Sequence, residues 1–179
     1  MRMFLLYTLL LAAVCLAGCD DDNNGNAISS YITLHDKSVA VHAPGRPDAD
    51  ISPTGELNIA NKSIALTDSE RALLRHYHVT AFAVRDHGIA TGKAGAATGM
   101  TAIRSVASNL ANGTPDKIDS EVNASAVKVE AKVALICNDL ADLRSTQETL
   151  ANQLPAFRPY ATIKADEAQR CRGEVHERR

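Results

Sequence analysis

Histidines are the residues of this sequence best suited to acid–base or metal chemistry, and their spacing decides which chemistry is open to them. The chain has six histidines. His35 and His42 fall on neighbouring expected strands, where they could approach each other and bind a metal ion. His76 and His78 are two residues apart, whereas a metal pair on a helix needs a spacing of four. We predict exposed or capping histidines, and a metal site stays the alternative.

His87 directly follows Asp86, and a neighbouring carboxylate can orient an imidazole as a general base. A hydrolase would also need an activated nucleophile, but the sequence has no Gly-x-Ser-x-Gly elbow and no cysteine with a cue for activation. Residues 91–95 (TGKAG) lack the Lys and Ser or Thr that follow the second glycine of a phosphate-binding loop. We interpret Asp139 and Asp142 as solvated helix-face charges. The sequence therefore predicts no catalytic residue, no cofactor and no metal.

Four glycines form the most suggestive group in the chain. Gly88 and Gly92, and likewise Gly95 and Gly99, have the small-xxx-small spacing of close helix contacts. One interpretation is a helix that meets a membrane or another protomer through this face, although the charged residues 85–87 argue against spontaneous insertion. The other is close packing against the following helix, or a break in the helix. We favour the second and predict a helix-packing face.

The amino terminus resembles a bacterial lipoprotein signal peptide. Arg2 gives a short positive start, residues 4–14 are apolar, and residues 16–19 (LAGC) place small residues before a cysteine. The apolar run is too short to span a bilayer, which takes about 20 residues. We predict cleavage between Gly18 and Cys19 and lipidation of Cys19, which would anchor the chain firmly because several acyl chains insert together. An ordinary cleaved signal with a chance cysteine is the alternative.

Residues 19–27 are predicted to be the lipidated cysteine and a flexible tether. Acidic and amide side chains with one glycine cannot build a core, and seven residues span at most about 23 Å. Asp20 resembles the retention signal that keeps lipoproteins of enteric bacteria at the inner membrane. The expected location is the cell envelope, facing the periplasm, with Asp20 favouring the inner over the outer membrane.

The other cysteines fit an oxidising compartment. Cys15 leaves with the signal, so Cys137 and Cys171 remain in the mature domain. We predict that these two form a disulfide, which would contribute about 3–4 kcal/mol in the chain-entropy model. Two free or intermolecular thiols are the alternative, and zinc is disfavoured because neither cysteine has a second ligand nearby.

Composition limits the remaining possibilities. Without residues 1–18 the chain keeps 18 Lys and Arg against 21 Asp and Glu, a formal charge of −3, which gives no electrostatic footprint for nucleic acid. Aromatic residues make up only 4% and tryptophan is missing, so stacking platforms for bases or sugars are scarce. Residues 28–179 are enough for one modest periplasmic domain.

An antiparallel β-meander is predicted for residues 28–66. Residues 31–35 and 39–42 alternate in polarity, and residues 52–55 (SPTG) have the composition of a turn. Residues 57–59 and 63–66 flank a second expected hairpin loop at 60–62. Strands this short need another element to cover their apolar face.

A helical hairpin is predicted for residues 67–154. Thr67 and Glu70 form a capping box, and the pattern that follows has an apolar stripe at seven-residue spacing, which comprises Phe82, Ile89, Ala96, Ile103 and Leu110. A Gly-Pro turn leads to a second helix whose seam alternates by four and three residues and contains one polar member, Gln147. Residues 155–179 are expected to be an irregular tail drawn back by the disulfide. The predicted fold class is therefore α+β, with a small meander packed on a long antiparallel helical hairpin.

Two parts of the chain resemble an uncharacterised proteobacterial envelope family, represented by the enterobacterial YggN protein. Residues 49–59 (ADISPTGELNI) and 66–77 match its strand, turn, strand and helix start, and residues 136–154 are similar to its C-terminal helix. Residues 88–99 have no counterpart in the family pattern. The family has no established activity, so the resemblance implies no catalytic residue.

These observations lead to three hypotheses about function. The favoured one is a lipid-anchored, non-enzymatic protein that binds another periplasmic or membrane protein. The alternative is a periplasmic enzyme or metal-binding protein that uses His35, His42 or His87. A structural spacer between envelope components is the third.

Overall fold

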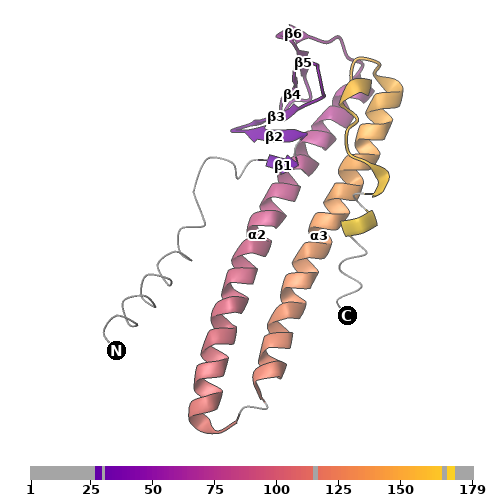
Figure 1. Cartoon of the computed structure of the whole chain (residues 1–179). Helices are drawn as coiled ribbons and strands as arrows, with labels where there is room; N and C mark the ends of the chain where they lie inside the picture. The colour runs from indigo at the N-terminus through magenta and orange to yellow at the C-terminus, as the bar shows by residue number, and fades with distance from the viewer. Residues whose placement is uncertain (1–26, 30, 115–116, 167–168, 172–179) are drawn as a thin grey trace.

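The computed structural model describes residues 27–29, 31–114, 117–166 and 169–171, and the fold is α+β. A six-stranded sheet packs at one end of two long helices that run antiparallel, side by side (Figure 1). The strands are β1 (Ala27–Ser29), β2 (Ile32–His35), β3 (Ser38–Val41), β4 (Ala49–Ile51), β5 (Leu57–Ile59) and β6 (Lys62–Ser63). The helices are α2 (Asp68–Asn112) and α3 (Lys117–Gln153), followed by a short 3-10 helix, η1 (Arg158–Tyr160). The predicted meander on a helical hairpin is confirmed.

The sheet is a simple meander, because each strand pairs antiparallel with the next one along the chain. Asp36 and Lys37 connect β2 to β3. Ala60 and Asn61 connect β5 to β6 with left-handed φ angles of 51° and 59°, the geometry of a two-residue hairpin turn. β1 is an addition, since the sequence placed its first residue in the tether and predicted no strand there. Its pairing with β2 extends the sheet toward the middle of α2 (Figure 1).

The predicted turn at residues 52–55 brings the sheet against the start of α2. The Gly55 amide donates to the Ser52 carbonyl at 3.0 Å, and Gly55 has a φ of 79° that favours glycine. A Cβ atom at this position would lie 2.3 Å from the Arg71 carbonyl oxygen. Only a glycine therefore fits between this turn and the helix.

Local chemistry caps both ends of α2. The Thr67 side chain accepts a hydrogen bond from the Glu70 amide at 3.2 Å, and the Glu70 carboxylate accepts from the Thr67 amide at 2.7 Å. This reciprocal pair confirms the predicted capping box. Gly113 ends α2 with a φ of 68° in the left-handed region, and α3 begins four residues later.

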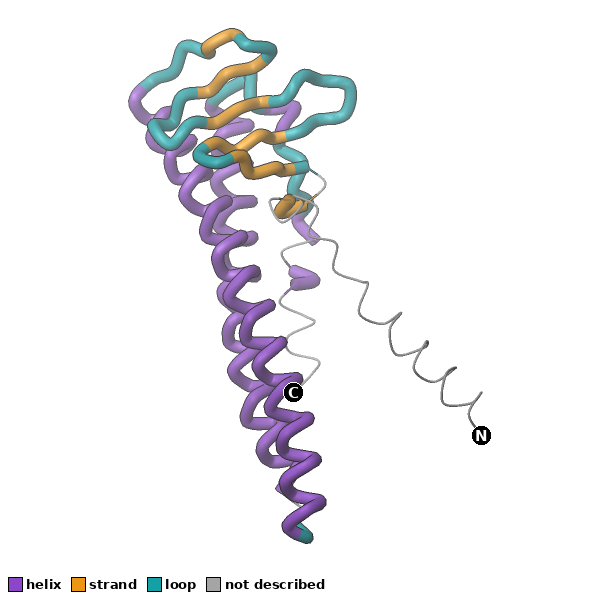
Figure 2. Tube along the Cα trace, turned by 90° about the vertical axis from the view of Figure 1, so that its left-hand side faces the viewer, coloured by secondary structure: helices purple, strands orange, loops and turns teal. Residues whose placement is uncertain are grey.

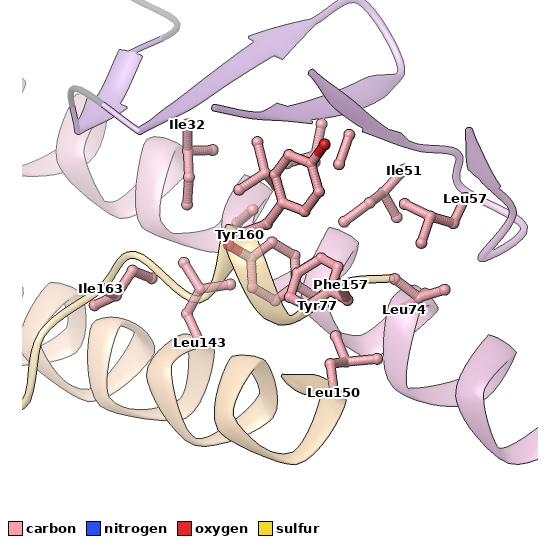
Figure 3. Close-up of a cluster of buried hydrophobic side chains, with 14 of the residues drawn as sticks. Ile32, Ile51, Leu57, Leu74, Tyr77, Leu143, Leu150, Phe157, Tyr160 and Ile163 are labelled. Atoms are coloured by element: carbon pink, nitrogen blue, oxygen red, sulfur yellow. The ribbon is translucent and has the colours of Figure 1, made fainter. Parts of the chain in front are cut away.

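The hydrophobic core lies between the sheet, the sheet end of the hairpin and the segment after α3 (Figure 3). Tyr77 of α2 and Phe157 make an edge-to-face ring contact with centroids 5.8 Å apart, and Tyr160 packs beside Phe157. Alternate residues of the strands, such as Ile32 and Ile51, point into the same core. The tail is therefore more ordered than expected, because its aromatic side chains complete the core and Tyr160 closes η1.

A disulfide and a buried glutamine hold the tail against α3. Cys137 and Cys171 form the predicted disulfide, with Cα atoms 5.5 Å apart. Gln147, the polar member of the predicted α3 seam, is buried and bonds the backbone of Ile163 twice, donating to its carbonyl at 2.7 Å and accepting from its amide at 3.1 Å. A buried amide satisfied in this way fixes the register of the tail on the helix.

Candidate functional site

The glycine face of α2 lies on the outside of the hairpin. Gly92, Gly95 and Gly99 are exposed and Gly88 is half-buried. A Cβ atom added at any of the four would have no described heavy atom within 4 Å, apart from nearby backbone of the same helix. The favoured prediction, close packing of these glycines against the second helix, is therefore wrong. A helix break is also wrong, because α2 continues from Asp68 to Asn112.

The apolar stripe predicted at seven-residue spacing also faces away from α3. Ile89 is 49% exposed, Ile103 67% and Leu110 64%, and Met100 beside them is 50% exposed. Only Phe82, nearest the sheet, is partly buried against the core. We define the α2 stripe as the uncovered part of this face, which comprises Ile89, Gly92, Ala96, Gly99, Met100, Ile103, Val106 and Leu110.

The α2 stripe continues the side of α2 that the sheet covers. Leu74, Tyr77 and Ala81 are fully buried in the core beneath the strands. Steps of three and four residues carry the same row on to Gly88 and Gly92. The hairpin extends far beyond the sheet in this direction (Figure 2). One helix face thus runs from beneath the sheet into solvent, within the part of the chain that the structure describes.

Beyond the sheet, α2 turns a polar face toward α3. Ser105 and Asn109 are buried, and the Glu121 carboxylate of α3 accepts hydrogen bonds from both side chains. Thr98 Oγ1 donates to the Ala94 carbonyl of its own helix at 2.9 Å and lies 3.5 Å from a carbonyl of α3. Hydrogen bonds join the two helices here, while several large apolar side chains of α2 lie outside.

Two histidine–carboxylate pairs cross between the helices closer to the sheet. His87 Nδ1 lies 2.5 Å from Asp139 Oδ2, and His76 Nε2 lies 2.9 Å from Asp142 Oδ2. Thr80 Oγ1 also donates to Asp142 at 3.1 Å. The interpretation of both aspartates as solvated charges was therefore incomplete. Their three-residue spacing on α3 could have indicated a common face toward α2, but their partners follow only from the helix pairing.

The remaining histidines of the described chain lie on the strands or contact them or their connecting turns. His42 Nδ1 donates to Asp48 at 2.7 Å, and its Nε2 lies 2.8 Å from Thr33 Oγ1. His78 Nε2 donates to the Lys37 carbonyl at 2.7 Å. His35 lies at the turn end of β2 and β3, whereas His42 follows the opposite end of β3, so these two are not brought together. No cluster of three or more His, Cys, Asp or Glu suited to a metal occurs among the described residues.

The predicted signal and anchor, including Gly18, Cys19 and Asp20, lie outside the described residues. Among the described residues, no helix is both long and apolar enough to cross a bilayer. Comparisons with known protein families, with curated proteins and with solved structures find no match.

The α2 stripe is the candidate functional site of the described chain. It combines exposed branched side chains with glycines that leave the helix backbone open to close approach, which is the chemistry of a helix-binding surface. Val127 at 60% and Leu135 at 44% exposure add isolated apolar side chains on α3. The seven-residue repeat indicated the residues of the α2 stripe except Met100, but the predicted partner surface on the second helix was wrong.

Proposed function

We propose that this chain is a lipoprotein of the bacterial envelope, anchored through Cys19, whose folded part faces the periplasm and binds another protein. Residues 1–19 support the anchor by their charge, apolar length and small-residue exit. The Cys137–Cys171 disulfide supports an exported chain, because such bonds persist in oxidising compartments. Asp20 favours the inner membrane, and the resemblance to the YggN family supports an envelope role.

The observation that carries the binding role is the α2 stripe. Isolated exposed apolar residues are ordinary on a protein surface, whereas a continuous helix face of them marks an interaction site. If only solvent contacted this face of α2, polar residues and alanine would keep the helix stable, and large apolar side chains would serve no purpose there. The proposed activity is therefore protein binding and not catalysis.

Labelling with a palmitate analogue in producing bacteria tests the anchor. We expect the intact chain to be labelled and to fractionate with membranes, and the Cys19→Ser variant to lose the label. Cys15→Ser is the matched control and should keep it, because that residue leaves with the signal. An unlabelled intact chain contradicts the anchor.

Crosslinking in intact cells tests the binding role. Bacteria producing the tagged chain would be treated with a short crosslinker and the adducts purified and identified. We expect reproducible adducts that weaken when Ile103→Ser and Leu110→Ser are introduced together. Ala97→Ser and Val127→Ser form the control pair, since both residues are exposed outside the α2 stripe. Adducts unaffected by the first pair, or none at all, would overturn the proposal.

A further inference from the structure

We infer that the α2 stripe packs antiparallel against the α2 stripe of a second copy of this chain. Ile89 of one copy then lies opposite Val106 of the other, Gly92 opposite Ile103, and Ala96 opposite Gly99. This inference rests on the proposed binding role of the stripe and names a second copy as its occupant.

The glycines indicate a close partner, because the single chain gains nothing from them. A glycine inside a helix costs about 0.5–1 kcal/mol relative to alanine, and α2 has four. Alanine would fit at each position, since an added Cβ meets no described atom outside the nearby helix backbone. Glycine in a helix is useful where a second helix approaches the backbone closely.

The spacing of the α2 stripe is that of a helix seam. Ile89, Ala96, Ile103 and Leu110 recur every seven residues, and Gly92, Gly99 and Val106 follow each of the first three by three residues. In the antiparallel arrangement, the row that begins at Ile89 on one helix meets the row that begins at Gly92 on its partner. The proposed alignment then places an isoleucine over a glycine at positions 103 and 92, so large side chains fill the spaces that small ones leave.

The sheet determines the direction of the pairing. It covers the same side of α2 around Tyr77 and Ala81. In a parallel pair the two sheets would lie at the same height and collide. In an antiparallel pair the far end of one hairpin reaches the sheet edge of the other, with Leu110 opposite Arg85 and Gly113 opposite Phe82. Shifting the pairing further toward the sheet would overlap residues that the sheet already covers.

Charge does not oppose this direction. Lys93 and Arg104 are the only charged residues from 87 to 112. The antiparallel alignment places Lys93 level with Ala102 of the other copy, so no charge lies opposite it, and Arg104 lies off the seam. A parallel pair would instead bring the Arg85–Asp86 ion pair of each copy against its own equivalent, with no opposite charge gained.

The length of the α2 stripe predicts a modest interface. At ~1.5 Å per residue, Ile89 to Leu110 extends over about 32 Å. Two helices in contact over that length bury on the order of 1,000 Å², the lower end for specific interfaces. Anchoring both copies in one membrane would raise their effective concentration and favour pairing.

Site-directed crosslinking of the full-length chain tests the pairing and its direction. Two differently tagged copies, one with Ile89→Cys and one with Val106→Cys, would be produced together and treated in cells with a short bis-maleimide. We expect the two-tag product to exceed by at least ~10-fold, or about 1.4 kcal/mol, that of the Ala97→Cys and Arg104→Cys control pair. The unsubstituted chain gives the background. Self-crosslinking of Ile89→Cys at the same level would overturn the antiparallel arrangement, and a product no stronger than the controls would overturn the dimer.

A size exchange tests direct contact. Gly92→Leu in the first copy should reduce the two-tag product by at least ~10-fold. Ile103→Ala in the second copy should then restore it, because the smaller side chain makes room opposite the larger one. Failure of this rescue contradicts the proposed alignment.

Palmitate labelling of the same cells separates this inference from the anchor. Strong crosslinking of an unlabelled chain supports the dimer and overturns the lipid anchor. Labelled chain that crosslinks no better than the controls overturns the dimer alone. Adducts with other proteins that depend on the stripe, together with no two-tag product, also overturn the second copy as occupant.

Discussion

The two ends of the helical hairpin are stabilised in different ways. At the sheet end, Tyr77, Leu143 and Phe157 are completely buried among strands, helices and tail. At the far end, Ser105 and Asn109 occupy the interior, and Ile103 lies in solvent. The same helix α2 thus changes from an apolar to a polar interior face along its length.

This difference assigns stabilisation of the fold to the sheet end of the hairpin and leaves a surface for binding at the far end. The sheet end buries apolar surface and supplies the main stabilisation of the fold. The far end is held by helix propensity and by hydrogen bonds to Glu121, each a modest contribution. Its apolar side chains are therefore available to a partner.

Truncating a large side chain at each end should give the greatest contrast. Phe157→Ala should lower the free energy of unfolding by about 3–5 kcal/mol, because it leaves a cavity in the core. Ile103→Ala should change it by less than about 0.5 kcal/mol, because that side chain is 67% exposed. Urea unfolding at low protein concentration measures both. Equal losses would show that the far end also contains a core.

The disulfide should matter almost as much to the sheet end. Cys171→Ser is expected to lower the free energy of unfolding by about 2–4 kcal/mol, since it releases the tail from α3. Under reducing conditions the intact chain should become nearly as unstable as the variant. A gap that persists in reductant would mean that the serine itself causes the loss.

Replacing glycine by alanine should change the free energy of unfolding in opposite directions at the two ends. Gly55→Ala should destabilise the fold by about 1–3 kcal/mol, because Gly55 has a positive φ and adjoins the Arg71 carbonyl. Gly99→Ala should stabilise the dilute single chain by about 0.5–1 kcal/mol, because the added methyl group meets nothing. Urea unfolding provides the comparison. A loss at Gly99 that disappears on dilution would place a partner there.

Removing the Tyr77 hydroxyl should have the smallest effect at neutral pH. This buried hydroxyl has no hydrogen-bond partner among the described residues, so Tyr77→Phe should be neutral or stabilise the fold by up to about 1 kcal/mol. Tyr160→Phe is the control and should cost about 1 kcal/mol, because Tyr160 donates to the Pro47 carbonyl at 2.6 Å.

The buried Tyr77 hydroxyl should also make stability depend on pH in the alkaline range. Burial raises the pKa of Tyr77, so above about pH 10 the unfolded chain loses a proton that the folded chain keeps. Stability should therefore fall as the pH rises above 10, and Tyr77→Phe should reduce that fall. Burial also raises the pKa of Tyr160, so part of the loss should remain. An identical pH profile for Tyr77→Phe would contradict this explanation.

Sequence patterns predicted most of the fold because their signals are local. Thr67 and Glu70 identified the helix start, and alternation over Ile32 to Val41 identified two strands. The second helix seam was also correct near the sheet, where Leu143, Gln147 and Leu150 are buried. β1 was missed because its three residues adjoin a polar stretch and become a strand only by pairing with β2.

The candidate site was only half predicted. The residues of the α2 stripe stood out because apolar and glycine residues recur every seven positions. Their direction did not, because α2 has a second row of small and polar residues, including Thr98 and Ser105, that suits a helix contact equally well. Which row turns toward α3 depends on the core around Tyr77 and on the pairing of His87 with Asp139, both set by distant segments.

The sequence alone predicted the meander, the capping box at the start of α2 and the pairing of Cys137 with Cys171. Caps, turns and periodicity act between neighbours in the chain, so one sequence suffices to identify them. Only the tertiary structure decided that the tail enters the core and that the α2 stripe faces outward. Those outcomes depend on how the sheet, the two helices and the tail share a limited apolar surface, and this involves residues more than a hundred positions apart, such as Tyr160 and Pro47.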